Sequence, residues 1–231
     1  MPDLTDYRTA IDQEVPGEFG HVPEATWDRA IAKAMREHSQ HRPRELVADL
    51  VGDGGFAYAL DSLTDWEDDF SQVKQVEFPV DDSSETKDIL EPEDWQIYQA
   101  PTGKELHFLR DWAAADESMR ITYSARHTCT ATACTVPGAD EDAVMVLAAA
   151  YFCRALAASY SQDQDSTIAA DQVEQGGKRR SYRNQAKDYE AEYYRHLGIK
   201  PGQAKPANVI QDMDVNYSDG GDRLTHPRRY R

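Results

Sequence analysis

The sequence has little positive charge. Its 231 residues include 25 Lys and Arg against 42 Asp and Glu, which gives a formal net charge of −17 at pH 7. A general nucleic-acid-binding protein needs Lys and Arg to neutralise phosphates, so this balance excludes that class. Such acidity favours solubility, and it would also suit a surface that must not adhere to DNA passing close by.

Cysteine is scarce as well. Three residues make no disulfide framework, and we expect a small, odd number of thiols to suit a reducing compartment. Cys129 and Cys134 flank a Thr/Ala run, but no second Cys or His pair at zinc-finger spacing completes a metal site. A pair of His127 with Cys129 would lack the third group that orients a nucleophile and its base. We therefore predict no catalytic residue, no cofactor and no metal.

Long apolar runs are missing too. The apolar fraction of 40% lies below the roughly 45–50% of typical domains, so we expect a modest core. The first twenty residues are acidic and contain no apolar segment, so we expect no secretion signal. The most apolar run, from Ala143 to Ala158, is interrupted by Arg154 and is too short for a bilayer. It predicts a buried helix and no membrane partner.

Two stretches on either side of the chain's middle have helical periodicity. Residues 23–43 carry an apolar stripe at i, i+3, i+4, i+7 and i+8, and Pro43 prevents continuation. Residues 140–160 begin with three acids, as the helix dipole prefers, and continue with an Ala-rich apolar run. Small residues let another backbone approach closely, so this helix is predicted to pack on several sides.

A third helix is predicted over residues 181–197, with Gly198 following its last turn. Its tyrosines lie on one face at helical spacing. Since Tyr is enriched at interfaces, we predict a subunit contact there, although an ordinary half-buried face has the same pattern. The residues predicted for this contact are Tyr182, Tyr189 and Tyr193.

Between residues 44 and 135 the periodicity changes to that of strands. Five or six short segments alternate apolar and polar residues, with a bulge expected around Val73. Pro101 to Lys104 reads as a tight turn, so the two flanking segments are predicted to form an antiparallel hairpin. The sequence thus predicts an antiparallel β-module inserted between helices.

The module's middle is strongly acidic. From Asp61 to Asp94 there are thirteen acids and only Lys74 and Lys87 to oppose them. These carboxylates lack the alternation and the glycine of a calcium loop, so we read them as a solvated face. An alternative of a different class remains open, in which the module binds a carbohydrate or another small molecule, or is a hydrolase that uses the acidic loops around Asp68 and Asp69.

The ends and one link lack periodicity. Residues 1–22 are predicted to form an irregular N-terminal arm, and residues 199–231 an extended C-terminal tail that orders on a partner. Gly176 and Gly177 are predicted to form a hinge after the link that begins at Ser161. The fold class is α+β: a helical core of three main helices, residues 23–43 and 136–198, with an inserted antiparallel β-module and extended termini.

Three sets of segments resemble head–tail connector proteins, also called adaptor or neck proteins, of tailed bacteriophages. The first runs from TVPGADEDAVMVLAAAYFCRALA through DSTIAAD to KRRSYRNQAKDYEAEYYRHLG, at residues 135–198. The second, EPEDWQIYQAPTGKELHFLR with MRITYSARH, resembles the β-portion of such proteins. The third, WDRAIAKAMREHSQHRPRE, resembles their first helix. The resemblance covers most of the chain, from about Pro23 to Gly198.

The resemblance implies a structural protein of the virion neck, assembled in the host cytoplasm. Such proteins form a homo-oligomeric ring, usually of twelve subunits, between the portal protein and the tail or tail-terminator (stopper) protein. Genomic DNA passes through the ring without specific binding. Another neck or tail-completion protein is the neighbouring alternative.

Members of this family commonly reach the portal with a C-terminal segment. The resemblance therefore implies that the tail of this chain contacts the portal. The residues predicted for this contact are Val209, Ile210, Met213, Tyr217, Arg223, Leu224, Arg228, Arg229, Tyr230 and Arg231.

Overall fold

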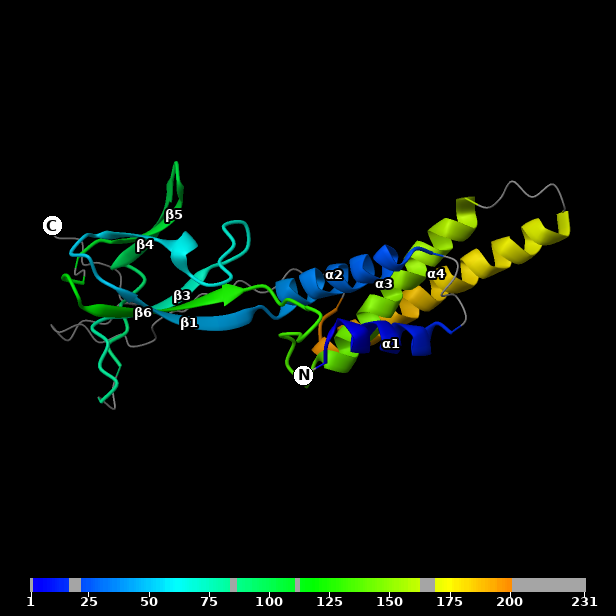
Figure 1. Cartoon of the computed structure of the whole chain (residues 1–231), viewed down its shortest axis with the longest axis horizontal. Helices are drawn as coiled ribbons and strands as arrows, with labels where there is room; N and C mark the ends of the chain where they lie inside the picture. The colour runs from blue at the N-terminus through cyan, green and yellow to red at the C-terminus, as the bar shows by residue number, and fades with distance from the viewer. Residues whose placement is uncertain (1, 17–21, 84–86, 111–112, 163–168, 201–231) are drawn as a thin grey trace, which may run out of the picture. The chain divides into compact units, whose positions relative to one another are not determined.

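The computed structural model describes residues 2–16, 22–83, 87–110, 113–162 and 169–200. Within these residues the fold is mixed α and β, with four α-helices and two small antiparallel sheets (Figure 1). Two helices precede the strands along the chain, and two follow them. The predicted combination of helices with antiparallel strands is confirmed, whereas the number of helices is four rather than three.

The additional helix lies in the segment predicted to be an irregular arm. Helix α1 spans Leu4–Glu14, and the side chains of Tyr7 and Ile11 are fully buried. These two residues lie four apart, so they face the same side of the helix. An acidic sequence with a single pair of buried apolar residues gave too weak a period for the helix to be predicted.

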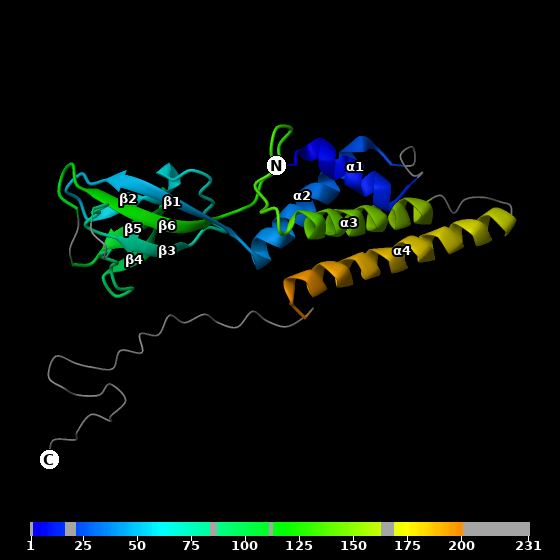
Figure 2. The same ribbon diagram turned by 90° about the horizontal axis from the view of Figure 1, so that it is seen from below.

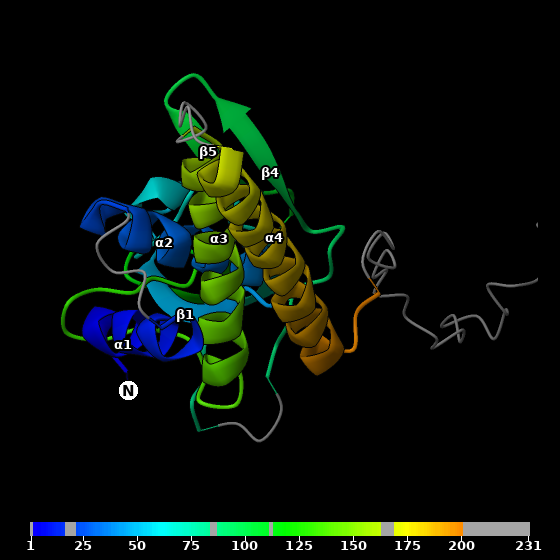
Figure 3. The ribbon, with the colours of Figure 1, turned by 90° about the vertical axis from the view of Figure 1, so that its right-hand side faces the viewer.

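The other helices of the N-terminal and C-terminal halves pack together. Helix α2 (Glu24–His41) and helix α3 (Glu141–Gln162) begin and end close to the predicted bounds. Figures 2 and 3 show α3 between α2 and α4 (Ala169–Leu197). The rings of Trp27 and Phe152 lie 4.0 Å apart, centroid to centroid, in the core of this bundle.

Helix α3 is buried on several sides, as its small residues predicted. Ala148, Ala149 and Ala150 have no exposed surface. From Glu141 to Ser161 the helix is also long and apolar enough to cross a membrane. The prediction that this apolar segment is too short for a bilayer is therefore wrong. Since 61% of that window is buried inside the protein, the finding is only a weak indication of a membrane span.

Helix α4 corrects the predicted hinge. It runs without interruption through Gly176 and Gly177 to Leu197. Each glycine in a helix interior costs about 1 kcal/mol relative to Ala, and packing along the rest of a long helix can offset that cost. Gly198 then ends the helix with φ of 68°, in the left-handed region, as predicted for this position.

The strands form two three-stranded antiparallel sheets. The first has the order β1-β6-β3, from Arg44–Val51, Ser118–Ala125 and Val73–Glu77. The second has the order β2-β5-β4, from Ala57–Ala59, Gly103–Phe108 and Trp95–Ala100. A short 3-10 helix, Leu60–Ser62, follows β2.

Two local predictions are confirmed in these sheets. Strands β4 and β5 form an antiparallel hairpin in which Ala100 pairs with Gly103 across Pro101 and Thr102. The register of β3 against β6 shifts between Val73 and Gln75, which is the expected bulge.

Gly52, after β1, lies where a side chain does not fit: an added Cβ would lie 2.5 Å from the carbonyl oxygen of Ala114.

The buried residues form two separate clusters. One consists of residues from the four helices together with Val15, Cys134 and Val136. The other lies among the strands, with Met119, Ile121 and Tyr123 of β6 at its centre. Each cluster is a hydrophobic core in its own right, because no buried residue belongs to both.

Candidate functional site

One buried carboxylate connects three helices. The side chain of Asp140, just before α3, is 4% exposed. Nη1 of Arg42 donates to both of its oxygens, at 2.7 and 2.9 Å, and Nε2 of His196 lies 2.8 Å from Oδ1. Nε2 of His38 lies 3.7 Å from Oδ2. Because Arg42 and His38 belong to the α2 end and His196 to α4, we call this cluster the Asp140 junction.

The Asp140 junction holds its groups in fixed charge states. Burial alone would raise the pKa of Asp140, but the hydrogen bonds from His196 and Arg42 outweigh it and hold that pKa below its ordinary value. Burial, together with the neighbouring charge of His127, lowers the pKa of His38 to about 4, although Asp140 acts in the opposite direction. At neutral pH the junction therefore contains an ionised Asp140 beside a neutral His38.

A serine and a second histidine lie next to the junction without forming a catalytic pair. Oγ of Ser39 donates to the carbonyl oxygen of Met35 at 2.6 Å and accepts the backbone N–H of His127 at 2.9 Å. The ring nitrogens of His127 face the carbonyl oxygens of Arg42 and Thr135, each at 3.0 Å. Since Ser39 does not donate to a histidine, the geometry lacks the nucleophile–base contact that acyl transfer requires.

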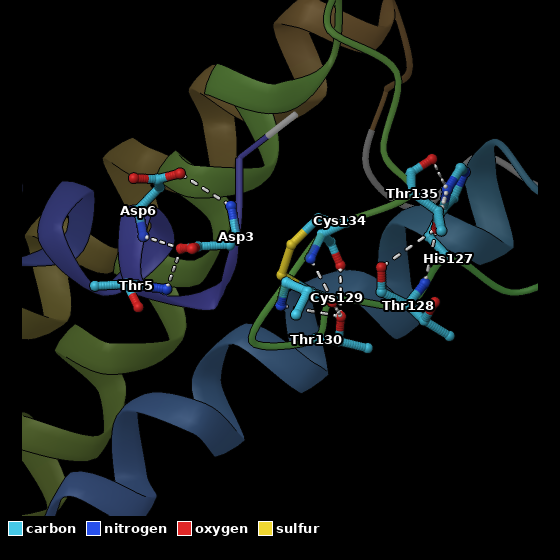
Figure 4. The surroundings of a disulfide bond; sticks show 11 residues. Asp3, Thr5, Asp6, His127, Thr128, Cys129, Thr130, Cys134 and Thr135 are labelled. Carbon is cyan, nitrogen blue, oxygen red and sulfur yellow. Dashed lines mark hydrogen bonds between the residues drawn. A yellow bond between two sulfur atoms is a disulfide. The ribbon is translucent and has the colours of Figure 1, made fainter.

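A short hairpin follows the strands and meets the N-terminus (Figure 4). Thr130 N–H donates to Ala133 O, and Thr135 N–H donates to Thr128 O, each at 2.9 Å. Between them Cys129 and Cys134 form a disulfide, so the expectation of unpaired thiols is wrong. This bond also removes Cys129 as a partner for His127.

The N-terminal segment pairs with this hairpin. Leu4 N–H donates to Thr130 O, and Cys134 N–H donates to Pro2 O. Asp3 then caps α1, with its carboxylate accepting from the N–H groups of Thr5 and Asp6 (Figure 4). These contacts fix the start of α1 against the rest of the helical part.

The cysteine arrangement predicts a defined count of reactive thiols. Cys153 is buried and unpaired, and burial raises the pKa of its thiol to about 12. A thiol reagent should find essentially none in the folded protein, one after denaturation, and three after denaturation with reductant. Finding three thiols in the denatured, unreduced protein would contradict the disulfide, and Cys153→Ala serves as the control that removes the single one.

The three tyrosines predicted as a subunit contact lie on α4 within the bundle. The ring of Tyr182 stacks on that of Tyr160, and the hydroxyl of Tyr189 donates to Glu14 O at 3.0 Å. Tyr193 is fully buried, and its hydroxyl lies 3.2 Å from Nδ1 of His38. Tyr193 has no surface left for a second subunit, so its predicted role is corrected to an intramolecular one. Tyr182 and Tyr189 keep partial exposure.

The predicted portal-binding residues, from Val209 to Arg231, lie outside the described residues.

A surface groove is lined by residues of α2, α3 and α4. Its cavity measures about 360 Å³. Helix α2 contributes most of its lining, and α3 and α4 contribute one tyrosine each. The lining residues are Lys33, Arg36, Glu37, Gln40, His41, Tyr151 and Tyr194. We call it the α2–α4 groove.

Inside the α2–α4 groove the single carboxylate is already hydrogen-bonded within the chain. Glu37 accepts hydrogen bonds from the hydroxyls of Tyr151 and Tyr194. Burial and then this carboxylate raise the pKa of Tyr194 to about 12. Nζ of Lys33 lies 5.7 Å from the ring centroid of Tyr151. Within the described part of the chain neither Lys33 nor Arg36 has an ion pair with a carboxylate, so the groove presents positive charge around two aromatic rings.

The β-module has a cavity of similar size, also about 360 Å³. Trp66, Trp95 and Ile97 give it an apolar lining, and Lys104 is its one charged residue. Asp68 instead accepts a hydrogen bond from Nε1 of Trp66 at 2.7 Å, and Asp69 does not line the cavity. A cavity without a carboxylate gives no support to the hydrolase alternative.

Several acids of the module are neutralised by arginines. Arg120 pairs with Asp49 and Asp82, at 2.7 and 2.8 Å, and these pairs hold the pKa of both carboxyls below the ordinary value. Arg44 pairs with Asp65 at 3.0 Å. The carboxylates of residues 88–93 have no such pair among the described residues, so that loop keeps its charge.

Sequence reasoning missed the Asp140 junction and the α2–α4 groove. In the sequence, Asp140 indicates only a favourable charge at the start of a helix. The spacing of His38 and Arg42, four residues apart on one face of a helix, was the available signal. Asp140 lies 98 residues from Arg42 and 56 residues from His196 along the chain, and no local pattern marks such pairs.

No group of three or more His, Cys, Asp or Glu side chains that could hold a metal ion occurs among the residues the structure describes. A scan against protein-family models finds no match for the chain, and a search of the curated proteins finds none either.

Proposed function

We propose that this chain is a structural protein of the neck of a tailed phage, a head–tail connector that forms a ring between portal and tail. In this proposal residues 23–43 and 136–198 form the connector core, residues 44–135 are its inserted β-module, and α1 joins the core. The C-terminal tail, residues 199–231, contacts the portal. The protein performs no catalysis, holds no cofactor and contacts no membrane.

The observation that carries the proposal is the set of helices in which the sequence resemblance lies. The resembling segments include α2, α3 and most of α4, which pack on one another around a shared hydrophobic core. A connector needs such a rigid body, because each subunit must hold the same position in a closed ring.

Exposed apolar side chains on the β-module support an assembled state. Val47 and Val51, on the outward face of β1, are 60% and 63% exposed. Strand β1 pairs only with β6, so its other edge is free among the described strands. Such an edge with exposed valines is a typical place for another chain to bind.

The net charge of −17 also fits a ring around passing DNA. Like charge on a channel wall prevents tight contact with phosphates, so DNA can slide without being held.

The test is reconstitution with the portal protein of the same phage. Purified chain and portal should form one complex, and electron microscopy should show a ring with the same axis as the portal; native mass spectrometry gives the number of copies, expected to be twelve. A chain that does not bind portal and is missing from the neck of virions would refute the proposal. A position further down the tail would favour a tail-completion protein instead.

A further inference from the structure

We infer that copies of this chain associate head to tail, with the loop before β4 of one copy docked in the α2–α4 groove of the next. This inference rests on the proposed ring and names the surfaces that would build it. A contact between two different surfaces repeats from copy to copy, so it generates a ring or, if it does not close, a filament.

The docking loop consists of residues 87–94, between β3 and β4. Ile89 is 54% exposed, although it is a large apolar residue. Around it stand the exposed carboxylates of Asp88, Glu91 and Glu93. The loop therefore combines one exposed apolar side chain with three exposed carboxylates, against the single positive charge of Lys87.

The backbone of this loop is held in place. Phe78 N–H donates to Asp88 O, and Leu90 N–H donates to Val76 O, each at 2.9 Å. Leu90 packs against the hydrophobic core of the β-module. Since the loop is anchored on both sides of Ile89, that side chain is presented outward at a low cost in entropy on binding.

The α2–α4 groove has the complementary character. Lys33 and Arg36 contribute positive charge to its lining, and the rings of Tyr151 and Tyr194 contribute apolar surface. On α4 the same face continues with the exposed Arg183 and Lys187, at helical spacing from Tyr194. An acidic loop with an apolar tip matches this groove in both charge and polarity.

A second copy is the partner that the charges favour. The chain as a whole carries −17, so a nucleic acid is repelled before it reaches one local basic groove. Another copy brings the acids of residues 88–93, which have no ion pair among the residues that the structure describes, on a loop that is already folded. The groove's own carboxylate, Glu37, accepts hydrogen bonds from two tyrosine hydroxyls. It therefore competes little with the acids of the second copy for Lys33 and Arg36.

Charge reversal tests the contact from both sides. The first variant is Lys33→Glu with Arg36→Glu, and the second is Glu91→Lys with Glu93→Lys. Each variant alone places like charges on the groove and the loop, so its self-association should weaken by about two orders of magnitude. In an equimolar mixture every groove faces a loop of opposite charge, and assembly should return. Circular dichroism of each variant verifies folding.

Sedimentation velocity at 0.1 M and 1 M salt measures assembly, and Arg179→Glu with Arg180→Glu is the matched control. That control makes the same charge change as Lys33→Glu with Arg36→Glu, but at exposed positions of α4, and it should assemble like the original chain. Loss of assembly in both reversals with recovery in the mixture supports the inference. Unchanged assembly in either reversal, or no recovery in the mixture, overturns it and leaves the proposed ring standing.

Two further results distinguish a failure of the proposed ring from a failure of the contact between loop and groove. If the unmodified chain is a monomer at every concentration and with portal, the proposed ring fails together with the inference. If Lys33→Glu with Arg36→Glu abolishes binding of a 20-base-pair duplex while assembly is unchanged, the groove takes nucleic acid and the inference is wrong.

Discussion

Replacing Phe152 by alanine is expected to lower the free energy of unfolding of the helical part by about 3–5 kcal/mol. Phe152 is fully buried in the middle of α3, and its ring contacts that of Trp27 on α2. The substitution removes the ring from a core that is closed on several sides, so the surrounding helices cannot collapse into the space.

Urea titration followed by ellipticity at 222 nm measures this loss. Phe56→Ala is the matched control, because Phe56 is 55% exposed in the β-module and its removal should change stability by less than about 0.5 kcal/mol. A second variant, Ile121→Ala, removes a fully buried residue from the other core. If Phe152→Ala costs under 1 kcal/mol, the packing described for α2 and α3 is wrong.

Acidification is expected to destabilise the helical part through His38. The pKa of His38 is about 4 in the folded protein and about 6.5 when the chain is unfolded, so the unfolded state binds the proton first. The stabilisation is therefore complete above pH 6.5 and is lost as the pH falls through 4. A difference of this size corresponds to about 3 kcal/mol.

The groups around His38 contribute in the same direction. Burial lowers the pKa of His127 too, so its protonation also favours unfolding. Asp140 has a lowered pKa and loses its stabilising charge only at still lower pH. Arg42 and His41 face the same site as further positive charge, which makes a proton on His38 less favourable.

The test compares urea midpoints from pH 7 to pH 4 in the original chain and in His38→Asn. Asparagine keeps a polar atom near the position of Nδ1 for Tyr193 but does not titrate. The variant should be less stable at pH 7 and should show a shallower decline toward pH 4. His107→Asn, in the β-module, should keep the full decline; an unchanged slope in His38→Asn would contradict the assignment.

Local patterns in the sequence predicted much of the fold. The stripe that begins at Trp27 placed α2, the turn at Pro101 placed the β4–β5 hairpin, and Gly198 marked the end of α4. Each of these features depends on residues within one or two turns of each other, so spacing alone reveals it. Helix α1 escaped because only Tyr7 and Ile11 make its buried face.

The candidate sites could not be predicted in the same way. Tyr193 has the spacing of a surface stripe, yet the fold places its hydroxyl beside His38, 155 residues away. The groove depends on Glu37 meeting Tyr151 and Tyr194 from two other helices. At Gly176 and Gly177 the local sequence predicts a hinge that the structure does not have, since packing along α4 overrides the weak local preference of these glycines.

The strand-bearing part of the β-module, residues 44–125, begins and ends at adjacent points. Arg44, its first residue, pairs directly with Ala125 at the end of β6. Paired Cα atoms lie about 5 Å apart, so a two-residue link could join the chain where the module was cut out. Because the two hydrophobic cores share no buried residue, a chain in which such a link replaces residues 44–125 is expected to keep the packing of the helical bundle.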